Sequence, residues 1–280
     1  MNTARPRRPL RALFACCLAF VSMLAAAAAF AADPPSAGAT AKPVKIKPKG
    51  TGEGGNESSG GLLQPDVNVI DAPTSAVLDY GGYSSVSRFY SGGGVLEYVS
   101  FGVFQNLNIG GSLSMDSIIG SDRNVRLRAP DAQVKYRFYE GDRWFPSFAV
   151  GYDGQGYDYN STDKRYNNKQ RGFYVVGTQE LGVPGLEVHP SMNISDFDGN
   201  SFYGSIPFSY NIQDKVSLLA EWDNIQNFYD SRLNMGVRAY LTPHFHLDFA
   251  VRRIGSGGLY GNGDTRRPER IVQIRYSGNF

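Results

Sequence analysis

The chain has 280 residues, with 28 Lys and Arg against 26 Asp and Glu, and its formal net charge at pH 7 is +2. Its two cysteines, Cys16 and Cys17, lie in an N-terminal segment that we expect to be removed. The mature chain therefore has no thiol, which excludes disulfides, thiolate metal sites and cysteine nucleophiles.

The first 31 residues have the pattern of a cleaved signal peptide. A basic region is followed by an apolar, Ala-rich run over 13–30, and Ala29-Phe30-Ala31 supplies small residues for cleavage. The run is short for a membrane-spanning helix and a polar stretch follows it, so we expect removal rather than anchoring. Losing the four arginines before residue 12 leaves 24 basic against 26 acidic residues, a mature net charge of about −2.

Residues 32–72 are predicted to be a disordered periplasmic linker. The stretch is rich in proline, carries a Gly/Ser run over 50–61 and has almost nothing apolar to bury. Four lysines between residues 42 and 49 form a small basic cluster. A solvated tether is the simpler interpretation, and a contact with an anionic periplasmic partner is the alternative.

Residues 73–280 alternate apolar and polar side chains, which is the period of a sheet with two different faces. In the stretch over 132–138, for example, Ala132, Val134, Tyr136 and Phe138 alternate with polar residues. The pattern predicts an all-β fold, a transmembrane antiparallel up-and-down β-barrel of about twelve strands. We expect strands over 80–91, 95–105, 107–118, 131–139, 144–156, 171–181, 186–196, 202–212, 216–224, 232–241, 245–254 and 269–280.

Two features favour a membrane barrel over a soluble sandwich. Tight turns alternate with longer, Gly-rich or charged connections, as expected when the turns face the periplasm and the loops face outward. The chain also ends in an alternating strand closed by Phe280, which resembles the assembly signal of outer-membrane proteins. The sequence therefore predicts a bacterial outer-membrane location with both termini periplasmic. The expected partners are outer-membrane lipid, lipopolysaccharide and the barrel-assembly machinery, and nucleic acid is excluded by location.

If the apolar side chains face lipid, the polar ones face the lumen. Both charge signs occur on adjacent strands, which favours an ion-pair network filling a narrow barrel, because unpaired buried charges are costly. A charge-selective constriction for small solutes is the alternative. The predicted lumen charges are Lys135, Arg137, Asp153, Glu187, Glu221, Asp223, Arg238, Asp248, Arg252 and Arg275.

One segment offers weak candidates for nucleophilic catalysis. His189 and Ser191 lie two apart on one face of a predicted strand, with Asn193 next along it. A serine nucleophile needs a base within hydrogen-bond reach and a third group that orients the base. The spacing is similar to that of outer-membrane phospholipases, but here the residues face the lumen rather than lipid. A polar lumen is the simpler interpretation, and the sequence predicts no catalytic site, metal site or cofactor.

The predicted outward loops are basic although the mature chain is not. Their cations would meet lipopolysaccharide phosphates, or would capture or pass an acidic polysaccharide. The residues concerned are Arg123, Arg126, Arg128, Lys164, Arg165, Lys169, Arg171, Arg266 and Arg267.

Several stretches resemble a known family. They are Asp71-Ala72-Pro73-Thr74, residues 134–138, residues 149–156 and Glu269-Arg270-Ile271. Together they resemble YjbH-like outer-membrane proteins, which are associated with exopolysaccharide production. The resemblance covers most of residues 70–280 and implies a non-enzymatic barrel linked to exopolysaccharide secretion or surface display. A small-solute porin is the first alternative, and an outer-membrane lipid- or polysaccharide-modifying hydrolase is the second.

Overall fold

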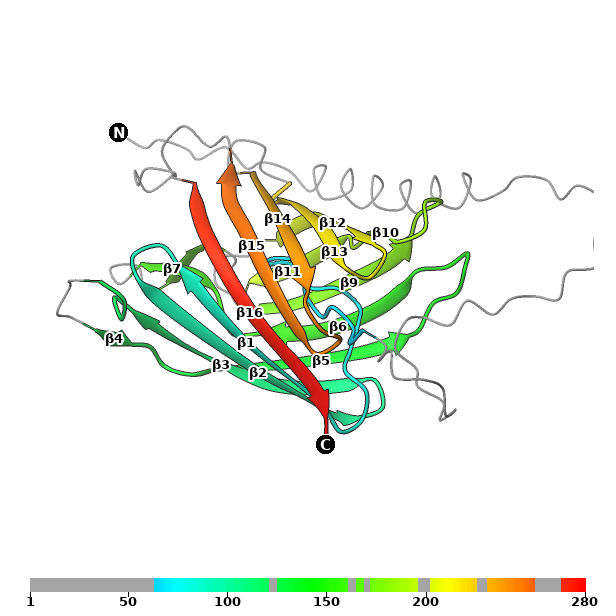
Figure 1. Ribbon diagram of the computed structural model, residues 1–280, viewed down its shortest axis with the longest axis horizontal. Coiled ribbons are helices and arrows are strands. Elements are labelled where there is room, and N and C mark those ends of the chain that lie inside the picture. The colour runs from blue at the N-terminus through cyan, green and yellow to red at the C-terminus, as the bar shows by residue number, and fades with distance from the viewer. Residues whose placement is uncertain are drawn as a thin grey trace, which may run out of the picture. The chain divides into compact units, whose positions relative to one another are not determined.

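The alternating segments form the wall of a closed antiparallel barrel in the computed structural model (Figure 1). The structure describes residues 63–120, 125–160, 165–168, 172–195, 202–225, 231–254 and 268–280. The predicted signal peptide and residues 32–62 lie outside them. The strands are β1 (Gly82–Tyr90), β2 (Gly94–Phe104), β3 (Leu107–Asp116), β4 (Arg126–Leu127), β5 (Asp131–Tyr139), β6 (Ser147–Asp153), β7 (Tyr157–Asn160), β8 (Arg165–Asn168), β9 (Gly172–Glu180), β10 (Leu186–Val188), β11 (Ser191–Ser195), β12 (Phe202–Ile212), β13 (Val216–Asp223), β14 (Arg232–Tyr240), β15 (Phe245–Ile254) and β16 (Glu269–Asn279).

The wall has twelve strand positions, which confirms the predicted fold. Wall strands pair antiparallel with their neighbours in sequence, and β1 pairs with β16 from Gly82↔Asn279 to Phe89↔Val272 to close the barrel. The sheet contains fourteen strands, but β10 and β11 share one position between β9 and β12, and β4 only extends β3. Strands β7 and β8 form a separate hairpin.

Two predicted strands differ in detail. The strand expected over 186–196 is interrupted between β10 and β11 at His189-Pro190, because proline has no N–H to donate to a neighbouring strand. The His189 N–H still donates to Pro207 O at 2.9 Å, so the sheet continues across the interruption. The strand expected over 144–156 is shorter and begins at Ser147.

The barrel wall is polar inside and apolar outside. On β13, Ser217 and Glu221 are buried, whereas Leu218 is 46% and Trp222 41% exposed. A soluble sheet would bury the apolar set instead, so this inverted pattern identifies an outer-membrane-type barrel whose exterior faces hydrocarbon. Within the ranges that the structure describes, no helix is long and apolar enough to cross a membrane.

The longest connections lie at one end of the barrel, which also holds the three-residue turn at 91–93, and the connections at the other end have seven residues or fewer. The short-turn end holds the connections at 105–106, 181–185, 213–215 and 241–244, together with the first residue of β1 and the last of β16. Gln213 and Asp214 both have positive φ (54° and 58°), as the two central residues of a type I′ turn require, and Lys215 N–H donates to Ile212 O at 3.1 Å. The long-loop end holds the connections at 117–130, 154–171 and 255–268.

Residues 66–79, here called the lumen finger, lie inside the barrel. The finger folds back on itself at Asn68↔Pro73, where Val69 N–H donates to Ala72 O (3.0 Å) and Thr74 N–H to Val67 O (3.1 Å). Its tip residues Val69 and Ile70 pack on Leu219, Ala250 and Ile271, three inward-facing side chains of the wall. The predicted linker boundary at residue 72 is therefore corrected: residues 66–72 belong with the barrel.

The finger leaves the lumen at the short-turn end, directly before β1. The Gly81 N–H donates to Gly102 O at 2.9 Å, and Gly82 N–H to Asp79 O at 2.8 Å. A Cβ atom on Gly102 would lie 1.9 Å from Asp79 O, so glycine is required for the finger to pass this closely over β2.

Candidate functional site

Arg238 on β14 joins three strands to the finger. Its Nε and Nη2 donate to Asp248 at 2.8 and 3.0 Å, and Arg275 Nε donates to the same carboxylate at 2.7 Å. On the finger side, Nη1 lies 2.8 Å from Asp66 Oδ1, and Nη2 donates to the carbonyls of Asn68 (3.2 Å) and Val69 (2.7 Å). The guanidinium, fully buried, thus has both charged and neutral acceptors, which offset the cost of removing it from water.

Glu221 on β13 holds the tip of the finger through its backbone. The N–H groups of Ile70, Asp71 and Ala72 all donate to Glu221 Oε1, at 2.6, 2.8 and 2.8 Å. Its other oxygen accepts from Asn234 Nδ2 at 3.1 Å. Successive N–H groups that converge on one oxygen form an anion-binding nest, here occupied by a wall side chain.

Asp71 at the finger tip bridges two arginines of the wall. Arg88 Nη1 lies 2.7 Å from Asp71 Oδ1, and Arg252 Nη1 lies 2.8 Å from Asp71 Oδ2. Arg88 also donates to the Ile70 carbonyl at 2.7 Å, and Arg252 pairs with Glu269. One finger carboxylate therefore connects β1 with β15.

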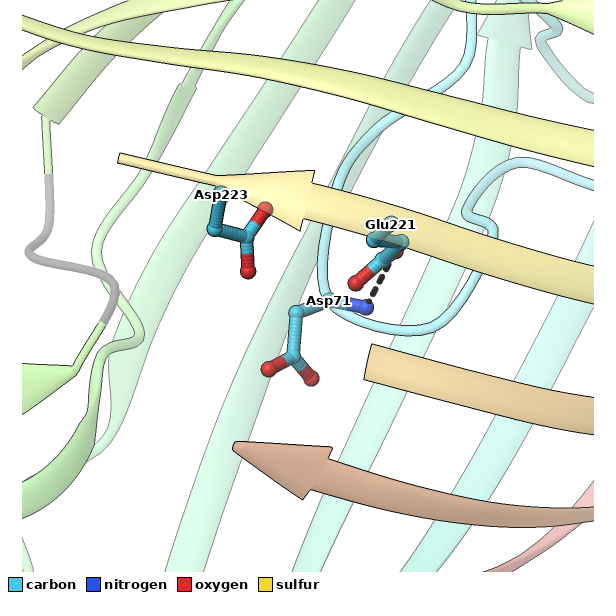
Figure 2. A group of neighbouring side chains, drawn as sticks. All are labelled: Asp71, Glu221 and Asp223. Atoms are coloured by element: carbon cyan, nitrogen blue, oxygen red, sulfur yellow. Dashed lines mark hydrogen bonds between the residues drawn. The ribbon is translucent and has the colours of Figure 1, made fainter. Parts of the chain in front are cut away.

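Three carboxylates gather at this point, and Figure 2 shows Asp71 on the finger next to Glu221 and Asp223 of β13, with its backbone N–H directed at Glu221. Within the described part of the chain, their ligand atoms lie within 4.8 Å of one another, close enough to hold a cation. Each carboxylate already accepts protein donors, however: Asp71 from the two arginines, Glu221 from the finger, and Asp223 from Asn234 Nδ2 at 2.8 Å. We assign the group to anchoring the finger.

Side chains on the opposite side of the wall also form hydrogen bonds with the finger. Lys135 Nζ on β5 donates to the carbonyls of Val67 (2.6 Å), Thr74 (3.1 Å) and Ala76 (3.3 Å). Ser75 Oγ lies 2.5 Å from Ser147 Oγ on β6. The cavity that remains beside Lys135 has a volume of 40 Å³, room for only a few water molecules.

Three predicted lumen charges lie apart from this network. Arg137 donates to Asn106 Oδ1 (2.7 Å) at the short-turn end, Asp153 accepts from Gln133 (3.1 Å), and the side chain of Glu187 is 46% exposed. The residues that the sequence prediction omitted include Asp66 and Asp71 on the finger, and Arg88 and Glu269 on the wall. Arg88 could have been found from the alternation of the sequence, because it shares the inward face of β1 with Ser84.

The structure does not bring the catalytic candidates together. The two ring nitrogens of His189 each lie 3.0 Å from another hydroxyl, Nδ1 from Thr178 and Nε2 from Ser209. Ser191 Oγ instead lies 2.6 Å from Ser205 Oγ. Among the hydrogen bonds of the described residues, none joins Asn193 to His189 or Ser191. The histidine is buried in the wall of the lumen, away from lipid.

Only part of the predicted basic loops is described. Arg126 is exposed on β4, whereas Arg128 pairs with Asp116 of β3. The backbone of Arg165 lies in β8. Outside the described residues are Arg123, Lys164, Lys169, Arg171, Arg266 and Arg267.

The terminal residue Phe280 lies at the short-turn end. Its N–H donates to Gly81 O at 3.0 Å, and its ring stacks at 6.3 Å on Phe101. The side chain is 89% exposed and belongs to the barrel exterior.

No family model and no curated protein matches the chain. Among solved structures, it is similar to a KdgM porin (10% identity, TM-score 0.47, covering 71% of this chain and 99% of the porin). It is also similar to the NanC porin (13%, 0.40, 71% and 99%) and to the COG4313 outer membrane channel from Pseudomonas putida F1 (13%, 0.45, 75% and 100%). These likenesses concern the fold alone.

Proposed function

We propose that the protein is an outer-membrane channel closed by its own finger, and that it serves the passage or display of an acidic polysaccharide of the cell envelope. The observation that carries the proposal is the occupied lumen: residues 66–79 make hydrogen bonds or ion pairs with wall side chains on opposite sides of the barrel. In this proposal the barrel is not an enzyme.

The nature of the contacts favours a releasable finger over a permanent core. The wall is closed by strand pairing alone, through β1 and β16, so it does not need the finger to complete it. The finger is held mainly by polar contacts, and water can replace each of them when the finger moves. Its buried apolar residues are Val69, Ile70, Ala72, Val77 and Leu78, of which Val69 and Ile70 pack on apolar side chains of the wall.

The proposed cargo rests on charge and on sequence resemblance. The resemblance to YjbH-like proteins implies a role in exopolysaccharide production, and the basic outward residues suit an acidic polymer or lipopolysaccharide phosphates. We further propose that both termini are periplasmic, because the short-turn end of a bacterial barrel faces the periplasm. Insertion by the barrel-assembly machinery belongs to the same proposal.

Conductance in planar bilayers tests the channel. The parent chain should conduct little, whereas a variant with residues 66–76 replaced by a Gly/Ser stretch of equal length should give a large, stable conductance. The matched control replaces residues 51–61, which precede the described part of the chain, and should behave like the parent. Heat-modifiable mobility in detergent gels reports folding of each variant. A parent that conducts as well as the finger variant, or a folded finger variant that does not conduct, would refute the channel proposal.

The envelope role needs a cellular test. Deleting the gene should lower surface polysaccharide, measured as uronic acid per cell, and the parent gene should restore it. The Gly/Ser finger variant, whose channel cannot close, should also restore the surface polysaccharide. That result would connect the channel with the polysaccharide. An unchanged polysaccharide level in the deletion strain would contradict the role.

A further inference from the structure

A cavity of 290 Å³ lies at the long-loop end of the lumen, lined in part by Arg88 and Arg252, which contact the finger residue Asp71. It is lined by residues at the strand ends next to the long loops, such as Tyr90 at the end of β1 and Glu269 at the start of β16. Its volume is close to the lower limit of small-molecule sites. Its charged lining consists of four arginines and two carboxylates: Arg88, Arg128, Arg252, Arg253, Asp116 and Glu269. We call this cavity the arginine vestibule.

A β-bulge brings one of these arginines into the vestibule. Between Leu233 and Met235 the register shifts, so that β15 contains one more residue than the facing part of β14. Arg253 has φ +58°, a left-handed conformation that is unfavourable for arginine, and its N–H donates to Asn234 Oδ1 at 3.0 Å.

The bulge changes where the side chain points. Consecutive residues of a regular strand face opposite sides of the sheet, which would turn Arg253 away from the lumen when Arg252 faces it. Instead, both guanidinium groups contact Glu269, Arg253 at 3.3 Å. Bulges that re-aim a side chain are common beside binding sites, and closing the barrel does not require this second arginine.

The vestibule shares two arginines with the finger. Arg88 and Arg252 line the cavity and also hold the Asp71 carboxylate, at 2.7 and 2.8 Å. A second carboxylate that enters the vestibule therefore competes with Asp71 for the same donors. Asp116 and Glu269 offer further lone pairs, which suit the hydroxyl groups of a sugar.

We propose that the arginine vestibule binds an acidic saccharide unit whose carboxylate replaces Asp71 on Arg88 and Arg252, and so releases the finger. The proposal names a ligand for the channel proposed above. Its gating step, the release of the finger, rests on that proposed channel function. Because the finger occupies the lumen between Arg88 and Arg252 and the short-turn end, the saccharide enters from the long-loop end. The channel thus opens in response to acidic polymer on that side of the membrane.

Isothermal titration of the purified, folded full chain with D-galacturonate tests the site, with D-galactose as the neutral control. The acid should bind and the neutral sugar should not. Arg253→Gly removes a guanidinium and relieves the positive φ, so it should fold normally and weaken acid binding about tenfold or more. Arg137→Gln, at the short-turn end, is the matched control and should bind like the parent.

Competition with Asp71 gives a more specific signature. In Asp71→Asn the competing charge is gone, so the acid should bind at least about tenfold more tightly than to the parent. Equal binding of acid and neutral sugar, unchanged binding in Arg253→Gly, or unchanged binding in Asp71→Asn would each overturn the proposal. Opening of the channel by acid added only on the short-turn side would overturn the direction of entry.

The two proposals fail separately. If the acid binds as expected but no finger variant conducts, the vestibule stands as a saccharide site and the channel function is wrong. If the Gly/Ser finger variant conducts but D-galacturonate does not bind, the channel stands and the vestibule proposal is wrong.

Discussion

Replacing Asp71 with Asn tests how strongly one carboxylate holds the finger. The change keeps the side-chain shape but removes the charge that Arg88 and Arg252 share, at 2.7 and 2.8 Å. A hydrogen bond to a charged group contributes about 1.5–3 kcal/mol, so two such bonds contribute roughly 3–6 kcal/mol. The Asn side chain keeps one acceptor oxygen, and both arginines keep their other acceptors. We therefore expect the closed state to lose about 3 kcal/mol, the low end of this range. That change raises the open-to-closed ratio on the order of 150-fold.

Single-channel recording measures this ratio directly. The backbone grip of Glu221 on residues 70–72 remains in Asp71→Asn, so we expect frequent openings rather than a permanently open channel. Ser75→Cys with Ser147→Cys supplies a lock, because the two hydroxyl oxygens lie 2.5 Å apart and both native cysteines precede residue 18. Asp71→Asn with the lock should stay closed when oxidised and open after reduction. An open probability equal to that of the parent in folded, unlocked Asp71→Asn would refute the reasoning.

Three further predictions concern the same lumen and its closing strand. Arg238→Ala leaves Asp66 and Asp248 without their shared guanidinium and should lower the free energy of unfolding by about 3 kcal/mol. This is the low end for a broken buried pair, because Arg275 still contacts Asp248. An unchanged urea midpoint would contradict this prediction. Removing Phe280 should slow insertion, measured as heat-modifiable protein in outer-membrane fractions, and normal insertion would show that the last strand does not carry the assembly signal. Burial opposes ionisation of Asp66, but Arg238 and Tyr240 hold its pKa below the ordinary value, so its stabilisation of the closed state is complete above about pH 4 and is lost below it. The contribution of Asp66 to closure should therefore be constant above about pH 5 and weaken below about pH 4, and Asp66→Asn should remove that part of the pH dependence.

The wall could be predicted because its physical signal is local. Most strands repeat the same alternation, so on β13 Leu218 and Trp222 can be separated from Ser217 and Glu221 without knowing which strands are neighbours. The exceptions are positions where one residue overrides the pattern. Pro190 interrupts the wall between β10 and β11, and the bulge at Arg253 inserts a residue that the alternation of β15 does not reveal.

The finger could not be predicted because nothing local marks it. Residues 63–72 lack alternation and are adjacent to a Pro- and Gly-rich stretch, so composition places them in the linker. Their backbone groups are satisfied by side chains far away in sequence, for example Glu221, which lies 151 positions after Ile70. The sequence prediction placed both charge signs in the lumen, but it paired wall residues with one another and omitted the segment between them.

The width of the lumen explains why a finger is needed at all. An eight-stranded barrel is narrow enough for wall side chains to fill, whereas a twelve-stranded barrel leaves space at its axis. Charged wall residues that reach into that space need hydrogen-bond partners, and the backbone of the finger supplies them for both anions and cations. Glu221 accepts from three N–H groups, and Lys135 donates to three carbonyls. Water can supply the same partners once the finger leaves. The charges that hold the finger therefore also make its departure feasible, whereas an apolar filling of the same volume would expose hydrophobic surface on opening.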